Sequence, residues 1–266
     1  MENLTVFKAI IMGIVEGLTE FLPISSTGHL ILAGEAISFT GDKAKMFEIV
    51  IQLGAILAIV WIYRKKILSV VKNCWKDKSA RSFVINIMTA FMPAAVIGLA
   101  VHKYIKKYLF NPVTVSFALI IGGLAIIVIE KMSHSNKITS TDQFDFKTSL
   151  KVGFAQVLAL FPGVSRSGAT IMGALAFGVD RKTAAEFSFF LAIPTMFAAT
   201  LYDLYKEHSM LSIHDAGIFT AGFVSAFITA LVVVYWFIKY ISNHNFMLFA
   251  YYRIVFGIIM LLFYLR

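Results

Sequence analysis

The sequence EGLTEFLPISSTGHL, residues 16–30, interrupts an apolar stretch that otherwise runs from residue 6 to residue 38. It holds two glutamates, several hydroxyl side chains, a histidine and Pro23. A proline removes a backbone N–H group and disfavours a continuing helix, so we expect two short helices that meet at a polar turn rather than one unbroken span. Ionisable residues at membrane depth are rare and functional by default, so this stretch is also the first candidate for a functional site.

The rest of the chain has the composition of a membrane protein. Of its 266 residues, 59% are hydrophobic and only 15% are charged, and the mean hydropathy is +0.80. A soluble domain is about half apolar and about a quarter charged. Stretches long enough to cross a bilayer occur at 46–63, 83–101, 113–130, 185–202, 216–238 and 246–264. We therefore predict an all-α, polytopic integral membrane protein with six transmembrane helices and a single membrane domain over residues 1–266.

A second broken region lies at residues 148–178, where FPGVSRSGAT (161–170) interrupts the apolar pattern. Non-helical backbone inside a membrane is tolerated only where protein or a water-filled cavity covers it. We therefore predict that 6–38 and 148–178 are both re-entrant helix pairs, each of which enters the membrane and returns to the same side.

The two broken regions resemble each other at a shift of 140 residues. The shift pairs Gly13 with Gly153, Glu16 with Gln156, Ser25 with Ser165 and Gly28 with Gly168. The chain is thus predicted to hold two internal repeats, approximately 1–130 and 148–266, each a re-entrant pair followed by three spans. An odd number of spans turns the second repeat upside down. Such inverted-topology repeats place a site near the midplane, where the broken helices meet.

The distribution of basic residues predicts the orientation of the chain. The formal net charge is +9 and the densest basic cluster lies in the segment 64–82. The positive-inside rule places that segment in the cytoplasm, 102–112 outside and 131–147 inside. This rule and attraction to anionic membrane lipids explain the positive charge, so no nucleic-acid partner is expected. The single cysteine, Cys74, cannot form an intrachain disulfide.

The glutamates of the first broken region predict a cation site. Glu16 and Glu20 are four residues apart, which places them one turn apart on the same helix face. Two neighbouring carboxylates repel each other, and a divalent cation, Mg²⁺ or Ca²⁺, or a shared proton relieves that repulsion. The alternative is a pair of glutamates at a helix end among lipid headgroups.

The hydroxyls after Pro23 predict a helix start. Ser25, Ser26 and Thr27 are typical N-cap residues, and a helix N-terminus binds phosphate well. His29 is close enough in sequence to reach Ser26 or a leaving oxygen. The alternative is that the hydroxyls only cap the helix and that His29 bonds a backbone carbonyl.

The second broken region supplies a matching anion site. Arg166 follows Pro162 at the opening of a helix that is rich in small residues, and its guanidinium has the geometry to bind phosphate oxygens. We predict one phosphoryl-transfer site between the two regions, in which Ser26 or a water attacks and His29 or a glutamate handles the proton. The predicted catalytic residues are Ser26, His29, Glu20 and Arg166; the substrate-binding residues are Ser25, Thr27, Arg166, Ser165, Ser167 and Thr170; the metal ligands are Glu16 and Glu20.

A few other polar residues are weaker candidates. Glu48 and Glu186 each begin a span, at matching positions of the two repeats, and are either interfacial or functional. Gln52 is predicted to hydrogen-bond between helices. Arg253, inside the last span, either pairs with an interior acid or extends to the membrane surface.

The segments EGLTEFLPISSTGH and PGVSRSGAT resemble the two signature motifs of the undecaprenyl-diphosphatase family, also called bacitracin resistance proteins. The resemblance covers essentially the whole chain. It implies an enzyme of the bacterial cytoplasmic membrane that hydrolyses undecaprenyl diphosphate to undecaprenyl phosphate and inorganic phosphate, which recycles the lipid carrier for peptidoglycan synthesis. It also implies an active site that opens to the outer face of that membrane.

The resemblance also implies roles for individual residues. The family's acidic pair falls on Glu16 and Glu20, its candidate nucleophile on Ser26, its motif histidine on His29, its essential arginine on Arg166, and its second-motif hydroxyls on Ser165, Ser167 and Thr170. Whether Ser26 attacks phosphorus or donates a hydrogen bond beside an activated water stays open.

A transporter is the alternative prediction, because inverted repeats with broken helices are typical of transporters. A flippase for a lipid phosphate, alone or combined with the phosphatase, would use the same architecture. The sequence does not determine the oligomeric state, a homodimer included.

Overall fold

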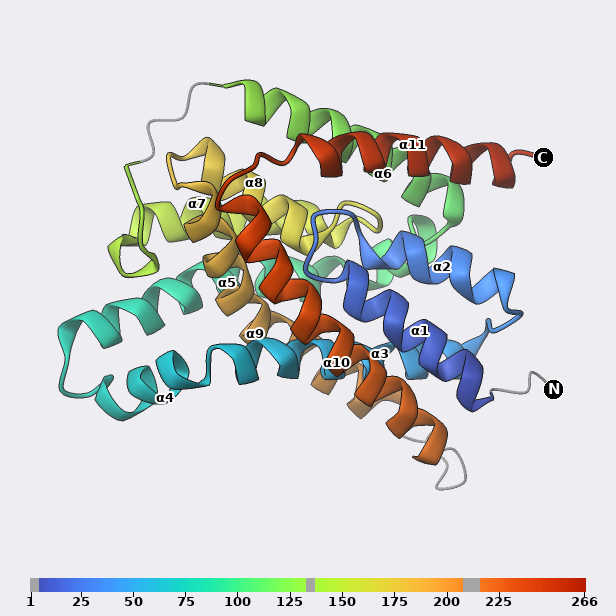
Figure 1. Cartoon of the computed structure of the whole chain (residues 1–266), viewed down its shortest axis with the longest axis horizontal. Helices are drawn as coiled ribbons and strands as arrows, with labels where there is room; N and C mark the ends of the chain where they lie inside the picture. The colour runs from blue at the N-terminus through green and yellow to red at the C-terminus, as the bar shows by residue number, and fades with distance from the viewer. Residues whose placement is uncertain (1–4, 133–136, 208–215) are drawn as a thin grey trace.

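The computed structural model describes residues 5–132, 137–207 and 216–266, and over these ranges the chain is helical without a named strand (Figure 1). Six of the helices are long and apolar enough to cross a membrane. They are α3 (Asp42–Ile62), α5 (Lys78–Tyr108), α6 (Pro112–Lys131), α9 (Arg181–Glu207), α10 (Ala216–Ile241) and α11 (Met247–Tyr264). The predicted all-α fold with six membrane-spanning helices is therefore confirmed.

The helix ends differ from the predicted spans where polar residues continue a helix. Hydropathy predicts a span over 83–101, but α5 begins at Lys78 because the Asp77 side chain accepts hydrogen bonds from the first backbone N–H groups of the helix. The basic segment 64–82, predicted only as a loop, contains a further helix, α4 (Arg64–Asn73). Hydropathy alone misses these turns because they are helical but not apolar.

Each broken region forms two short helices joined by a turn, as predicted. The first consists of α1 (Val6–Thr19) and α2 (Ser26–Ala36), which lie side by side in Figure 1. The second consists of α7 (Phe146–Val157), the 3₁₀ turn η2 (Leu158–Leu160) and α8 (Arg166–Ala176). We call residues 20–25 the first tip and residues 161–165 the second tip. That the two pairs are re-entrant in a membrane stays a prediction.

The two helix pairs share unusual backbone geometry at matching positions. Ser25 and Ser165, each just before the second helix of its pair, have φ angles of 70° and 77°. Ser38 and Gly178, each just after that helix, have φ angles of 51° and 86°. Positive φ is rare for residues other than glycine, so its recurrence at both serines is informative. It is the local similarity that the predicted repeat requires; the inverted topology itself stays a prediction.

Close packing of α1 against α10 places the first tip in the middle of the molecule. Gly13 and Gly17 face α10, and a Cβ atom at Gly17 would lie 2.6 Å from the carbonyl oxygen of Ala226. Glycines four residues apart allow two helix backbones to approach closely in a membrane, where packing rather than the hydrophobic effect drives association.

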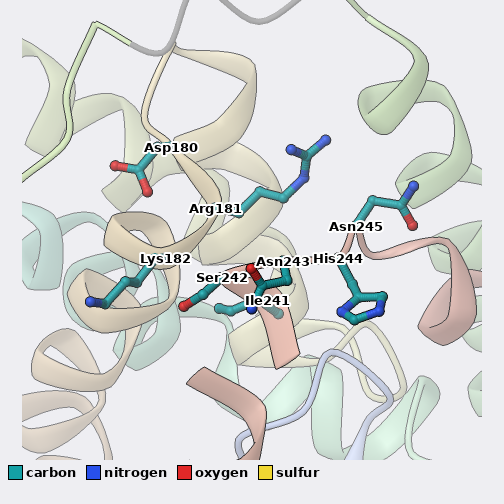
Figure 2. Close-up of a pocket in the computed structure, with 8 residues that line it drawn as sticks. All are labelled: Asp180, Arg181, Lys182, Ile241, Ser242, Asn243, His244 and Asn245. Carbon is teal, nitrogen blue, oxygen red and sulfur yellow. The ribbon is translucent and has the colours of Figure 1, made fainter. Parts of the chain in front are cut away.

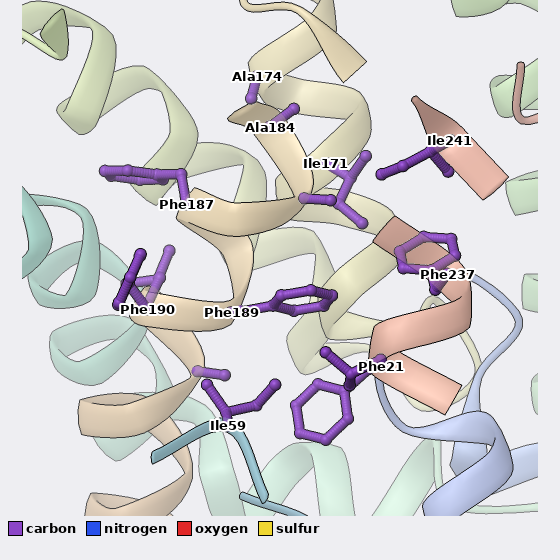
Figure 3. Packing of buried hydrophobic residues seen from close by; sticks show 14 of the residues in the cluster. Phe21, Ile59, Ile171, Ala174, Ala184, Phe187, Phe189, Phe190, Phe237 and Ile241 are labelled. Carbon is purple, nitrogen blue, oxygen red and sulfur yellow. The ribbon is translucent and has the colours of Figure 1, made fainter. Parts of the chain in front are cut away.

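Aromatic packing anchors the first tip in the core. Phe21 is fully buried, and its ring meets that of Phe189 edge-on at 5.5 Å, while Phe237 lies beyond Phe189 in the same cluster (Figure 3). These contacts pack the first tip against α9, and through Phe189 they connect it to α10. The neighbouring residue Glu20 is thereby held in place from the apolar side.

The basic residues of α4 mark one end of the molecule. Lys66 Nζ lies 3.0 Å from Asp142 Oδ1 and donates to Thr141 Oγ1 at 2.6 Å, which joins α4 to the segment before α7. The start of α1 and the end of α11 lie at the opposite end (Figure 1).

Candidate active site

The first tip holds both predicted acids inside the protein. Glu16 lies in the last turns of α1 and Glu20 directly follows the helix, and their side chains are 1% and 7% exposed. The alternative prediction, in which the two acids lie at a helix end among lipid headgroups, is therefore wrong. Ser26 begins α2 on the other side of the turn, so the short loop brings it back towards Glu20.

Glu20 joins the two tips through its carboxylate. Ser26 Oγ donates to Glu20 Oε2 at 2.5 Å, and Arg166 Nη2 donates to Glu20 Oε1 at 3.1 Å. Ser26 and Arg166 are the first residues of α2 and α8, respectively. The structure thus brings three of the four predicted catalytic residues into one hydrogen-bonded chain, although Arg166 is 146 residues away from Glu20.

Arg166 is fixed by contacts that leave one of its donors unused. Its Nη1 donates to the carbonyl oxygen and the hydroxyl of Ser188 at 3.0 and 3.3 Å, and its guanidinium lies 5.8 Å from the centre of the Phe21 ring. The buried Nε has no hydrogen-bond partner within the described ranges. A buried donor without a partner is costly, so it is a position where a ligand oxygen would be favourable. Ser188 was not predicted, because nothing in its local sequence connects it to Arg166.

His29 is turned to other partners and does not bond Ser26. Its Nδ1 lies 2.7 Å from the carbonyl oxygen of Ser25 and its Nε2 lies 2.7 Å from the Tyr252 hydroxyl. The ring also stacks on Phe256 with centroids 4.2 Å apart. The alternative in which His29 bonds a backbone carbonyl is therefore confirmed, and Glu20 takes the place beside Ser26 that was predicted for either a glutamate or the histidine.

The predicted substrate-binding hydroxyls fall into two groups. Thr27 lines a cavity described below, whereas Ser167 and Thr170 are fully buried. Ser167 Oγ donates to the carbonyl oxygen of Leu22 at 2.8 Å, and Thr170 Oγ1 lies 2.7 Å from Ser188 Oγ. These hydroxyls join the tips and helices to one another in the structure, and contact with substrate stays a prediction for them.

The two serines that precede the second helices behave differently. Ser165 Oγ accepts from the backbone N–H of Gly168 at 3.1 Å, which is an N-cap, and lies 3.0 Å from Ser167 Oγ. Ser25 is buried but makes no side-chain cap, although the two residues have similar backbone angles. The capping alternative, which was stated for the hydroxyls after Pro23, is therefore wrong for Ser25, and the cap occurs instead at Ser165 of the second tip.

A cavity of about 490 Å³ adjoins Ser26. It lies between the tips, the start of α3 and the C-terminal ends of α5 and α9. Its lining includes residues predicted to be catalytic, substrate-binding and metal-binding. Its lining residues are Glu16, Ser26, Thr27, Leu30, Lys45, Glu48, Ile49, Gln52, Ile105, Phe110, Ala159, Leu160, Pro162 and Asp203. Glu48 and Gln52, the weaker candidates of α3, therefore share a cavity with Glu16 and Ser26, and Glu186 does not line it.

The lining of this cavity fits a divalent cation better than Glu20 does. Both Glu20 oxygens already accept hydrogen bonds from Ser26 and Arg166. Glu16 Oε1, in contrast, is buried and has no partner in the part of the chain that the structure describes, and Glu48 lies in the same cavity. Within that part no three or more His, Cys, Asp or Glu residues form a cation cluster. Mg²⁺ commonly binds one or two carboxylates together with substrate phosphates, so two glutamates are sufficient.

A larger cavity, of about 660 Å³, lies at the basic end of the molecule between the start of α9 and the α10–α11 turn (Figure 2). Its side chains do not converge: Lys182 and His244 point away from each other in Figure 2. Arg181, on its wall, is already bound to Glu130, with N···O distances of 2.6 and 3.0 Å. We therefore place the site in the cavity beside Ser26.

Arg253 neither pairs with an acid nor extends to the surface, so both alternatives for this residue are wrong among the described residues. It is 1% exposed, so it does not extend to the surface, and it has no ion-pair partner among the described residues. Its guanidinium instead donates to backbone carbonyl oxygens of both tips.

The chain is similar to known proteins over nearly its full length. A family model described as bacitracin resistance protein BacA matches residues 9–259. The undecaprenyl-diphosphatase of Nitrosomonas europaea is 56% identical over 262 residues, which cover 98% of this chain and 96% of the relative. Those of Dechloromonas aromatica and Methylobacillus flagellatus are each 52% identical, over 98% and 99% of this chain and 95% and 100% of the relatives.

Proposed function

Because the chain belongs to the bacitracin resistance protein family, we infer that it hydrolyses undecaprenyl diphosphate to undecaprenyl phosphate and inorganic phosphate, and we propose that the reaction takes place at Glu20. The observation that supports this location is the Glu20 carboxylate, which binds the hydroxyl of Ser26 and the guanidinium of Arg166 together. A potential nucleophile, a base and a phosphate-binding group thus meet at one buried point beside a cavity.

The distance between Ser26 and Glu20 favours a glutamate as the general base. A nucleophile within hydrogen-bonding reach of a base is the arrangement that activates a hydroxyl. Ser26 Oγ attacks the terminal phosphorus while Glu20 takes its proton. The new Oγ–P bond forms as the bond from the terminal phosphorus to the bridging oxygen breaks. The electron pair of the broken bond stays on the bridging oxygen, which leaves as part of undecaprenyl phosphate. A water then hydrolyses the phosphoserine, which releases inorganic phosphate and restores the Ser26 hydroxyl.

The second route replaces serine attack with attack by a water. In this route Glu20 takes the proton of the water and Ser26 only donates a hydrogen bond. Both routes use the same residues and differ in whether Ser26 becomes phosphorylated. A Ser26→Ala enzyme that keeps most of its activity would support the water route, whereas trapping of phosphate on Ser26 would support the serine route.

Positive groups at the tips neutralise the diphosphate. Arg166 holds Glu20 with one nitrogen and has an unpaired buried Nε–H for a phosphate oxygen. Helices α2 and α8 both begin directly after the tips, and the N-terminus of a helix stabilises a bound anion. Preorganised donors of this kind stabilise the charge that develops on transferring phosphoryl groups.

We propose that Glu16 and Glu48 bind the divalent cation, Mg²⁺ or Ca²⁺. This replaces the predicted pair of Glu16 and Glu20, because the Glu20 oxygens are engaged. When bound, such a cation neutralises phosphate charge and polarises a phosphoryl oxygen. Glu16 supplies the unpaired carboxylate oxygen, and Gln52 lines the same wall of the cavity.

The cavity is proposed to open to the outer face of the bacterial cytoplasmic membrane. Its lining residues Lys45 and Glu48 lie near the start of α3, whereas the basic helix α4 follows the end of α3. If the basic end faces the cytoplasm, the start of α3 faces outward.

A homodimer stays a prediction. Crosslinking of the protein in membranes would measure its oligomeric state.

Phosphate release tests the proposed site directly. Purified protein with a polyprenyl diphosphate and Mg²⁺ should release inorganic phosphate, and Arg166→Ala should reduce the rate strongly. The matched control is Arg181→Ala, which removes an arginine that also pairs with a buried glutamate, but at the basic end of the molecule. Normal release by Arg166→Ala would contradict the proposed site.

Lipid transport remains a separate proposal that rests on the predicted inverted repeat. Movement of undecaprenyl phosphate across proteoliposomes can be measured apart from hydrolysis. If a hydrolytically inactive Glu20→Ala protein still moves the lipid, transport is an independent activity. If neither the wild type nor this variant moves it, the transporter alternative is excluded.

A further inference from the structure

Arg253 of α11 is buried beneath both tips and donates only to backbone oxygens. Its side chain is 1% exposed. The acceptors are the carbonyl oxygens of Leu119 (3.3 Å from Nε), Pro23 and Val164 (3.1 and 2.9 Å from Nη1), and Ala118 and Gly163 (3.1 Å each from Nη2). A guanidinium has five N–H donors, so this set of acceptors uses every one of them.

Three separate segments provide these carbonyls. Pro23 belongs to the first tip, Gly163 and Val164 belong to the second tip, and Ala118 and Leu119 belong to α6. Each tip carbonyl is within three residues of the helix start that carries Ser26 or Arg166. A change in the position of either tip relative to α11 would therefore move one of these two residues relative to the other.

Glycines, which have no side chain, line the slot that holds the Arg253 guanidinium. A Cβ atom at Gly122 would lie 2.1 Å from Arg253 Nη2, and one at Gly168 would lie 3.0 Å from Nη1. Gly163 has a φ of 91°, a conformation that L side chains rarely adopt. A side chain at Gly122 would therefore displace the guanidinium, and one at Gly168 would press against it.

We propose that Arg253 is a positioning residue that holds the two tips in register, so that Glu20 can bind Ser26 and Arg166 at the same time. This inference rests on the proposed active site. Arg253 has no contact with Glu20, Ser26 or Arg166 among its hydrogen bonds, so it acts through the backbone.

Lysine cannot replace arginine in this role. An ammonium carries three donors at a single point, whereas the guanidinium is a planar group whose donors reach in different directions. The five carbonyls can be bonded simultaneously only by a group with five donors, and the three donors of an ammonium leave at least two of them without a partner. Arg253→Lys keeps the charge but loses the link between the tips, and this separates positioning from a purely electrostatic effect on an anionic substrate.

Other side chains of α11 support the same role. Tyr252 bonds His29 through its hydroxyl, and Phe256 stacks on the His29 ring. These residues bind the start of α2 just beyond the first tip. α11 thus contacts the first tip region through neighbouring positions, and Arg253 also bonds the second tip.

The test compares Arg253→Lys and Arg253→Gln with a packing control in the same helix. Met260→Ala removes a fully buried side chain that packs against α6 in a cluster with Leu119, and so it should lower the thermal midpoint without changing kcat. We expect both Arg253 variants to lose on the order of 100-fold in kcat with an unchanged KM, because small displacements of reacting groups have effects of this size. We also expect faster hydrogen exchange in the segments 20–28 and 160–168.

Three outcomes would overturn the proposal. The first is Arg253→Lys with wild-type kcat, which would show that charge is sufficient. The second is a raised KM at constant kcat, which would indicate contact with substrate. The third is a loss of activity that matches the loss of folded protein, as for the control. If Glu20→Gln and Arg166→Ala are also fully active, the proposed site itself is wrong. If these two variants are inactive while the Arg253 variants are fully active, the proposed site stands and only the positioning role of Arg253 is wrong.

Discussion

Replacement of Glu20 by glutamine removes the charge at the centre of the site while preserving its shape. In the wild type, Glu20 Oε2 accepts from Ser26 at 2.5 Å and Oε1 accepts from Arg166 at 3.1 Å. A glutamine has one acceptor oxygen and one NH₂ group, so it can accept from Arg166 or Ser26 but directs a donor at the other. It also cannot take the proton of the attacking hydroxyl.

The expected effect on the rate follows from the loss of the base. General base catalysis contributes roughly 10²- to 10⁴-fold, which corresponds to about 3–5 kcal/mol in the activation barrier. We therefore expect Glu20→Gln to lower kcat at least 100-fold, measured as phosphate release at saturating substrate. Breaking a buried ion pair costs about 3–5 kcal/mol, so the thermal midpoint of the purified protein should also fall.

Glu130→Gln is the matched control for this variant. Glu130 has a side chain that is 2% exposed and is paired with Arg181, which is 37% exposed, at the basic end of the molecule. This substitution should lower stability less, because water can solvate Arg181, and it should leave kcat unchanged. If Glu20→Gln loses less than about tenfold in kcat, Glu20 is not the general base. If both variants lose activity equally, the effect is one of folding.

Further substitutions test the fold and the cation site. Phe21→Ala empties a fully buried position against Phe189 and should destabilise the protein by about 3 kcal/mol in a thermal or denaturant unfolding experiment in detergent; an unchanged stability would show that the first tip is anchored elsewhere. Gly17→Val places a side chain against the Ala226 carbonyl and should cost about 1–3 kcal/mol by separating α1 from α10, which the same unfolding measurement detects; wild-type stability would contradict this close approach. Glu16→Gln should raise the Mg²⁺ concentration that gives half-maximal thermal stabilisation as well as half-maximal phosphate release; unchanged Mg²⁺ dependence in both would exclude Glu16 as a ligand.

Most of the helices could be predicted from sequence because a membrane span is a local property. The apolar stretch 113–130 became α6 (Pro112–Lys131), and the stretch 246–264 became α11. The breaks at Pro23 and Pro162 were also local, since each proline is followed by residues that begin a new helix. The ends of α5 and the whole of α4 were missed because these turns are helical but not apolar, and hydropathy detects only apolar turns.

The proximity of the predicted residues was easier to predict than the way in which they pair. Glu16, Ser26 and Thr27 line one cavity, and Glu20 and Arg166 bind each other, as a shared site requires. His29 was expected near the Ser26 hydroxyl, yet its ring is bonded to the Ser25 carbonyl and to Tyr252. Tyr252 lies 223 residues away from His29, so no local pattern could have indicated that contact.

The sequence by itself determined which segments are apolar, where helices break and which chemical groups the breaks carry, because these depend on neighbouring residues. Only the tertiary structure decided how those groups pair. Glu20 became the partner of Ser26 and Arg166, and Arg253 became a donor to five backbone carbonyls, when distant helices packed closely enough for their polar atoms to meet. A buried polar group must find a partner, and the packing of the whole chain determines which partners are within reach.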